Sequence, residues 1–464
     1  MFAASTPVGL SAVGPSKEGN PLSHHRRSRR LVSALVGLVT LGCVPAVAGA
    51  APAAIPQADC FWTNRIASAY DTDAAHNYAF PDSGAVYWSA KVTMPAGSKI
   101  VLKGAFAHAR YQSINSYNKA NNAPIDALND VATKPDAGSV NPYRLGARRD
   151  ATKRAYTITV VNSGLPAGAR ADNTVYAGVE GQPDQLLLLR VYEPDSFKRA
   201  ELTGGVGLPK VELHLADGSI QTGAAACAAM QAQGGQLSLT TLPESLYKSL
   251  REPAGAASTF PAEAKPLFRA FYNTGFVISC WYQGNCTGNP LRAGGQYSNI
   301  DNQYVASFVS RGFAAGPVLV LKGKLPTTPQ TGAKVKRTGG GQMRYWSICQ
   351  NESLYTTKGA GCLYDSQIPV DAQGNYTIVT SRSADRPKNA TAKCGVAYLP
   401  WPKNGDGDGH LDDGLLLVRN MLPSPSFHQA VQNTKTPGDE AKVMGPYLPR
   451  GSYLTKAKFQ QRGC

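Results

Sequence analysis

The sequence predicts a mainly β protein with two tandem, related β-sandwich domains of the jelly-roll type, joined by a helical connector. Short apolar segments alternate with turns, and the 464-residue chain contains 47 Gly and 32 Pro, which is typical of many short strands. The chain also resembles itself at a spacing of about 219–234 residues. Its hydrophobic fraction of 42% is too high for a disordered chain.

The internal repeat consists of short segments that recur in the same order. Most of them are rich in β-branched residues and end at turn-forming residues, so we expect strands. One of them, 186–189, is continuously apolar and predicts a central strand buried on both faces. The matching pairs are 100–104 with 319–323, 110–114 with 344–348, 155–158 with 375–378, and 186–190 with 415–419.

Composition sets the expected domain boundaries. Within the connector, residues 243–250 and 263–272 have helix-like patterns, although Pro253 and Pro266 interrupt the segment. Apolar aromatic residues in this stretch argue against a flexible linker. The predicted divisions are a signal peptide at 1–50, the first sandwich at 51–222, the connector at 223–299 and the second sandwich at 300–464.

The N-terminus has the pattern of an export signal. A basic cluster at 24–30 precedes an apolar stretch at 31–44, and small residues suited to cleavage follow it. A retained membrane anchor is the alternative, and lipidation at Cys43 is a further open question. After cleavage no integral membrane span is expected, and we predict a secreted or cell-envelope-associated protein.

The charge balance points away from nucleic acid. Removal of residues 1–50 takes away five basic residues and one Glu, which lowers the net charge from +16 to +12. Outside Arg148-Arg149 and Lys153-Arg154 the remaining chain has no dense run of Lys and Arg, so nucleic acid is not an expected partner. Attraction to anionic envelope polymers is the more natural consequence of this charge.

Cysteine usage agrees with export. Eight Cys remain after the signal, and an even number in an exported chain predicts four disulfides, although eight Cys allow 105 pairings. Cys280 and Cys286 are close enough in sequence to form a local pair, whereas a metal site is disfavoured because no C-x2-C pair is present. The eight are Cys60, Cys227, Cys280, Cys286, Cys349, Cys362, Cys394 and Cys464.

Several of these segments carry a family resemblance. The chain resembles uncharacterised exported bacterial proteins related to a domain-of-unknown-function group with β-sandwich or jelly-roll domains. The resemblance implies a fold class and export, and it implies no reaction or catalytic residue. It rests on the residues at 110–117, 135–142, 344–351, 362–365 and 385–390.

One polar constellation in the first copy suggests chemistry. His108, Arg110 and Tyr111 lie close in sequence, and Asp130 follows, so an acid/base or anion-binding site is one hypothesis. The alternative is a polar strand end with a structural Arg–Asp pair, because the second copy keeps the Arg-Tyr pair. Arg190 and Arg419, which end the buried strand segments, are expected to be buried and paired with carboxylates.

Aromatic residues suggest a ligand surface. Trp281 and Tyr282 lie in the loop between Cys280 and Cys286, where they could stack on a sugar ring or fill a domain interface. We add four residues of the Arg-Tyr segments to the candidate ligand-binding set, namely Tyr117, Arg344, Tyr345 and Trp346.

An acidic loop suggests calcium. Asn404, Asp406, Asp408 and Asp412 occupy positions 1, 3, 5 and 9 of an EF-hand-like loop. Position 12 is Leu415, so the bidentate carboxylate is missing. A partial calcium site is therefore one interpretation and a solvated acidic hairpin loop is the other. We expect no other cofactor.

These observations favour a monomeric binding protein for an extracellular or cell-envelope ligand, either a carbohydrate or an anionic polymer. An extracellular hydrolase or lyase that uses His108, Arg110, Tyr111 and Asp130 is the first alternative. A structural secreted protein is the second.

Overall fold

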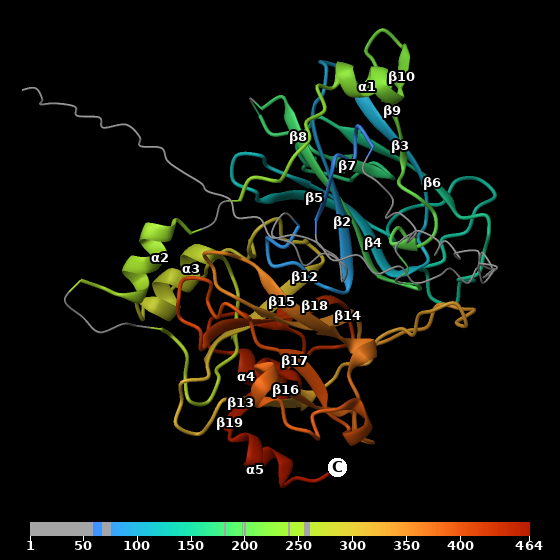
Figure 1. Ribbon diagram of the computed structural model, residues 1–464. Coiled ribbons are helices and arrows are strands. Elements are labelled where there is room, and N and C mark those ends of the chain that lie inside the picture. Colours follow the sequence, from blue (N-terminus) through green and yellow to red (C-terminus); the bar gives the residue numbers. More distant parts are fainter. Residues whose placement is uncertain are drawn as a thin grey trace, which may run out of the picture. The chain divides into compact units, whose positions relative to one another are not determined.

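A computed structural model describes residues 59–66, 76–180, 182–196, 198, 201–239, 242–254 and 260–464. The predicted signal peptide lies outside these residues, which all belong to one compact unit. No helix among them is long and apolar enough to cross a membrane. The fold is mainly β, and it contains four sheets, as the repeat and the turn spacing predict (Figure 1).

The first half contains two sheets. The first inner sheet contains, in spatial order, β1 (Asn64–Ile66), β2 (Ala85–Thr93), β8 (Asp184–Pro194), β4 (Ala109–Tyr117) and β5 (Pro124–Asn129). The first outer sheet contains β10 (Ile220–Thr222), β9 (Lys210–His214), β3 (Lys99–Ala105), β6 (Ala155–Val161) and β7 (Thr174–Tyr176).

The second half repeats this arrangement. The second inner sheet contains β11 (Arg269–Ala270), β12 (Asn302–Ser310), β18 (Asp413–Pro423), β14 (Met343–Asn351) and β15 (Gly359–Tyr364). The second outer sheet contains β17 (Ala397–Pro400), β16 (Asn375–Ser381), β13 (Val318–Lys324) and β19 (Arg450–Leu454). The strand order is the same in both halves except that β10 has no counterpart among the described strands of the second half. The recurring segments fall on equivalent strands: β3 with β13, β4 with β14, β6 with β16, and β8 with β18.

The helices are short. α1 (Gly223–Ala229), α2 (Glu244–Arg251) and α3 (Thr274–Val277) lie in the connector, and a π-helical turn (Ile278–Tyr282) follows α3. α4 (Glu440–Met444) and α5 (Lys456–Gln460) flank the last strand. The prediction of a helix at 263–272 is wrong. This segment is irregular and then forms β11, because Pro266 removes a backbone donor in its middle and Arg269–Ala270 pair with β12.

Three apolar layers hold the four sheets. The core of the first half lies between its two sheets, and the core of the second half is built in the same way. A third cluster, rich in tyrosine, contains residues from both inner sheets. The central strand β8 contributes Leu187 and Leu189 to the core of the first half and Leu186 and Leu188 to the third cluster, so this strand is buried on both faces as predicted.

All eight cysteines that remain after the predicted signal form disulfides. Cys280 pairs with Cys286, as the short spacing predicts, and Cys349 pairs with Cys362 across β14 and β15. Cys60–Cys227 and Cys394–Cys464 tie both ends of the described chain to the fold. Four disulfides fit a protein that folds outside the reducing cytoplasm.

We predict that Gly323→Ala lowers the free energy of unfolding by about 1–3 kcal/mol. Gly323 on β13 lies opposite Tyr376 on β16, and a Cβ on the glycine would come within 2.6 Å of the tyrosine Oη. Denaturant unfolding measures the change. The control is Gly339→Ala, where a Cβ meets no atom within 4 Å. Equal midpoints for both variants and the wild type would contradict the prediction.

Candidate functional site

The two halves exchange arginine–aspartate pairs. Arg110 on β4 donates from Nη1 to Asp365 Oδ1 of the second half at 2.8 Å. Arg344 on β14 donates from Nη1 to Asp130 Oδ1 of the first half at 3.0 Å. The two arginines also reach across to each other, and each donates to the other's main-chain carbonyl oxygen at 3.3 Å. Arg110 and Arg344 occupy equivalent positions of the repeat, and so do Asp130 and Asp365. Each arginine therefore pairs with the aspartate of the other copy.

Each aspartate in this exchange is also fixed within its own half. Asp130 Oδ2 accepts from the main-chain N–H of Gln112 at 2.7 Å, and Asp365 Oδ2 accepts from that of Trp346 at 3.0 Å. Burial raises the pKa of Asp130 to about 6, although Arg344 opposes the shift. Arg110 also contacts Glu193, whose pKa burial raises to about 7. The cluster is therefore a buried structural network at the junction of the inner sheets.

A second reciprocal contact involves tyrosines. Tyr111 on β4 donates to Asp301 Oδ2 of the second half at 2.6 Å. Tyr345 on β14 donates to Asp82 Oδ1 of the first half at 3.0 Å. Both rings are fully buried. Arg110, Tyr111 and Asp130, which the sequence suggested as part of a catalytic group, thus make contacts that join the two halves.

In the structure, His108 and Asp130 of the proposed acid/base group bond to different partners and not to each other. His108 lies against Arg154, which donates to its ring, and burial together with Arg154 lowers the pKa of His108. Within the described residues, no hydrogen bond connects the His108 ring to a carboxylate. Asp130 bonds to Arg344 instead. General acid/base catalysis needs hydrogen-bond reach between such groups, so this geometry lends no support to a hydrolase or lyase.

The aromatic candidates lie mostly inside the protein. Trp281 packs on Phe271 and Phe308 with ring centroids 6.3 and 5.6 Å apart, and Tyr282 is partly buried beside Phe308. Tyr117 and Trp346 are each 1% exposed. These side chains do not form an exposed platform for a sugar ring. Arg344 is partly exposed and lines a cleft with a volume of about 620 Å³ beside Tyr143, Arg144 and Leu145.

The acidic loop is engaged in protein contacts. Asp406 is fully buried, and its Oδ2 accepts from Tyr247 Oη of α2 at 2.8 Å and from His410 Nδ1 at 2.9 Å. Asp412 pairs with Arg311. Asn404 donates to Glu352, and Asp408 lies 3.7 Å from Lys248. These contacts dock the loop on α2. The partial calcium site remains a hypothesis.

One group of possible metal ligands occurs in the described part of the chain, and it does not fit a metal. The ligand atoms of Asp82, Cys349 and Cys362 lie within 4.8 Å of one another. The two cysteines form a disulfide with each other, so their sulfurs are not available as thiolates.

An exposed basic groove lies on the second outer sheet, and no motif in the sequence indicates it. The groove has a volume of about 730 Å³. Four cationic side chains line it, and none of them forms an ion pair with a described residue. They are Lys322 and Lys324 of β13, Arg450 of β19, and Arg462. The groove also contains Asp371, whose carboxylate accepts hydrogen bonds from Gln373 and Asn375 of its own turn.

Strand register places like charges together in this groove. Lys322 lies directly opposite Arg450 in the antiparallel pair of β13 and β19. Like charges at opposite positions destabilise a sheet, so the arrangement has a cost that an anionic ligand would relieve. The four residues come from distant parts of the chain. They therefore do not appear in the sequence as a dense run of basic residues.

The first outer sheet is a natural comparison. Lys103 lies opposite Lys210 in the equivalent strands, but Lys103 pairs with Glu212 at 2.6 Å. In the first half, Glu212 lies opposite Val101. Val320 is the equivalent of Val101 in the second half, and the residue opposite Val320 is Ser452. The second half thus lacks the carboxylate that pairs with Lys103 in the first. A comparison of the two copies at this position is the sequence signal that could have identified the groove.

We predict that Asp365→Ala lowers the free energy of unfolding by about 3–5 kcal/mol, because it removes a carboxylate partner of the buried Arg110. Denaturant unfolding measures the loss. Asp150→Ala is the control, since its pair with Arg148 is exposed and adds little to stability. A loss for Asp365→Ala no larger than that of the control would refute a stabilising role for the exchanged pairs.

We predict that Asp406→Ala destabilises the protein by about 1–3 kcal/mol equally in calcium and in chelator, because Tyr247 loses a buried acceptor. Thermal unfolding in both buffers tests this. Asp412→Ala is the control, because its carboxylate is half exposed. If calcium stabilises the wild type and not Asp406→Ala, the loop is a calcium site.

Comparison with known proteins gives few matches. No protein-family profile and no curated protein matches the chain. Two solved structures of uncharacterised bacterial proteins are similar over most of their length. One, from Burkholderia cenocepacia, has 14% identity and a TM-score of 0.45, and covers 86% of this chain and 84% of its own. The other, from Vibrio parahaemolyticus, has 11% identity and a TM-score of 0.38, and covers 81% and 90%. At these scores the similarity carries no functional argument.

Proposed function

We propose that this chain is an exported, monomeric protein that binds an anionic polymer of the cell envelope or its surroundings. The binding site is the basic groove of the second outer sheet. In this proposal the chain also belongs to the exported domain-of-unknown-function group that its sequence resembles. The single observation that carries the proposal is the set of four cations around the groove that lack ion-pair partners among the described residues.

The chemistry of the groove favours an extended polyanion. Lys322 and Arg450 are exposed, so they contribute to binding through screened attraction and not through a buried contact. Such charges also raise the rate of encounter with an oppositely charged polymer. A polysaccharide that carries sulfate, phosphate or carboxylate groups fits both the charge and the open form of the groove.

The two inner sheets support the choice of the basic groove as the binding site, because their polar residues are already engaged. The Arg-Tyr segments of both copies are committed to contacts between the halves. Parts of the outer sheets remain exposed, and in the first of them Lys103 pairs with Glu212. The groove of the second outer sheet is lined by cations without an ion-pair partner among the described residues.

We predict that Lys322→Glu/Arg450→Glu weakens binding of the full chain to dextran sulfate by about tenfold or more, since each basic residue near an anionic surface contributes roughly 1 kcal/mol. Affinity should fall as salt rises, and neutral dextran should not bind. Ser452→Glu, which installs the carboxylate of the first copy, should weaken binding to a smaller extent.

The matched control is Lys103→Glu/Lys210→Glu, which makes the same charge change at the equivalent positions of the first outer sheet. It should retain most of the affinity. An equal loss in the control and the groove variant would mean that binding follows net charge alone, and the groove would not be the site.

A further inference from the structure

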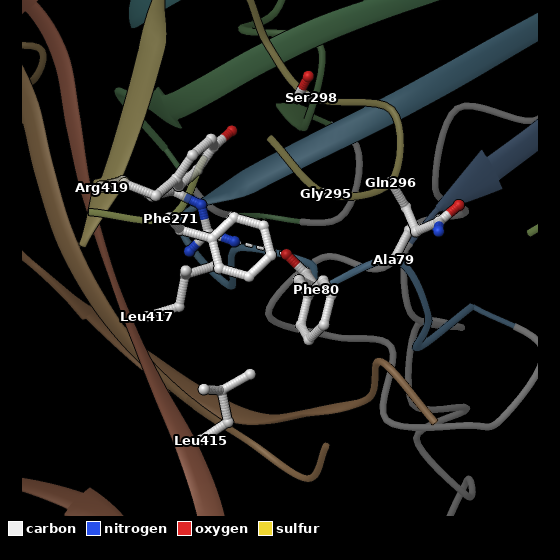
Figure 2. A pocket seen from close by; sticks show the side chains of 10 residues that line it. Ala79, Phe80, Phe271, Gly295, Gln296, Ser298, Leu415, Leu417 and Arg419 are labelled. Carbon is white, nitrogen blue, oxygen red and sulfur yellow. Dashed lines mark hydrogen bonds between the residues drawn. The ribbon is translucent and has the colours of Figure 1, made fainter. Parts of the chain in front are cut away.

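A small pocket between the two inner sheets contains two buried arginines. Arg190 of β8 and Arg419 of β18 occupy equivalent positions of the repeat and are 4% and 3% exposed. Both line a cavity of about 40 Å³, which is large enough for one or two water molecules or a single small ion. Figure 2 shows the adjoining pocket, into which Arg419 projects toward the main-chain oxygen of Phe80.

The two arginines differ in how their charge is balanced. Arg419 lies 3.5 Å from the fully buried carboxylate of Asp82. In the second half, Asp301 occupies the position that Asp82 occupies in the first, and it accepts hydrogen bonds from Tyr111 and Asn129. No carboxylate of a described residue lies within the 4.0 Å ion-pair distance of Arg190. The expectation that both arginines pair with carboxylates is therefore wrong for Arg190.

The hydrogen-bond partners of Arg190 are all neutral. Its Nε donates to Asn115 Oδ1 at 3.2 Å, and its Nη2 donates to Tyr117 Oη and to the main-chain oxygen of Tyr297. Its Nη1 has no acceptor among the described residues. Burying an ion without a counter-ion is unfavourable. Of the two arginines that line the cavity, only Arg419 has a carboxylate of a described residue within ion-pair distance, so the charge of Arg190 has no direct counter-ion among the described residues.

The walls of the cavity suit a small anion. Tyr87, Tyr192 and Tyr304 line it with Arg190 and Arg419. Tyr87 donates its hydroxyl hydrogen to Tyr192, and the phenols of Tyr192 and Tyr304 can donate theirs to an anion. The cavity is too small for a sugar, a nucleotide or a charged polymer group of several atoms. A neutral water molecule would fill the volume but would leave the charge of Arg190 uncompensated.

We propose that this cavity binds one monovalent anion of chloride size, held by Arg190 and balancing its charge. The bound ion is a structural ligand at the junction of the two halves. The proposal is independent of the basic groove, since the groove residues belong to the second outer sheet and the cavity lies between the inner sheets.

The test is thermal unfolding of the full chain at constant ionic strength, with chloride or bromide replacing gluconate. We expect the unfolding midpoint to rise and to saturate with a single-site dependence on halide concentration. Crystals soaked in bromide should show an anomalous peak beside Arg190. An unchanged midpoint, or a bromide-soaked crystal without that peak, would overturn the proposal.

Two variants identify the residue responsible. Asn115→Asp places a carboxylate beside Arg190 Nε, and Arg190→Gln removes the cation; both should abolish the halide response. Asn121→Asp makes the same charge change as the first variant at an exposed position and should respond as the wild type does. A normal halide response in Asn115→Asp would contradict the proposal. Lys322→Glu/Arg450→Glu should also keep the full halide response, which separates failure of this proposal from failure of the groove.

Discussion

The exchange of Arg110–Asp365 and Arg344–Asp130 is the constraint on which the rest of the structure depends. Arg110 and Arg344 each pair with an aspartate of the other half, so the polar residues of each inner sheet depend on the other sheet for a partner. A buried ion pair adds little net stability compared with an apolar pair, but a broken one is costly. The exchange therefore specifies how the halves meet more than it strengthens the contact.

Duplication gives the molecule its own internal comparison. The exchanged arginine and aspartate positions are the same in both copies, and a change in one half would leave a buried partner unsatisfied in the other. Positions away from the direct exchange are free to diverge. Glu212 has Ser452 as its counterpart, and the contact of Asp82 with Arg419 has no equivalent at Arg190. Both proposed binding sites lie at such differences between the copies.

The fold was largely predictable from the sequence, and the site was not. The continuous apolar run of β8, the turn spacing and the repeat identified the four sheets, because they report local burial and local chain reversal. The spacing of Arg110 and Asp130 suggested a pair within one half. Their actual partners belong to the other half, and a choice between equivalent partners depends on how the halves pack, which no local pattern encodes. The helix expected at 263–272 failed because pairing with β12 outweighed helical propensity.

The two positive features differ in their physics, although both attract anions. Lys322 and Arg450 are solvated, so their attraction is weak for each charge, additive along a polymer and reduced by salt. Arg190 is buried, where screening is slight and a single ion can balance the whole charge. Salt should therefore act in opposite directions at the two places: it competes with a polymer at the groove, and it supplies the ligand at the cavity. The halves could thus be held together most firmly under the ionic conditions in which the groove releases its polymer.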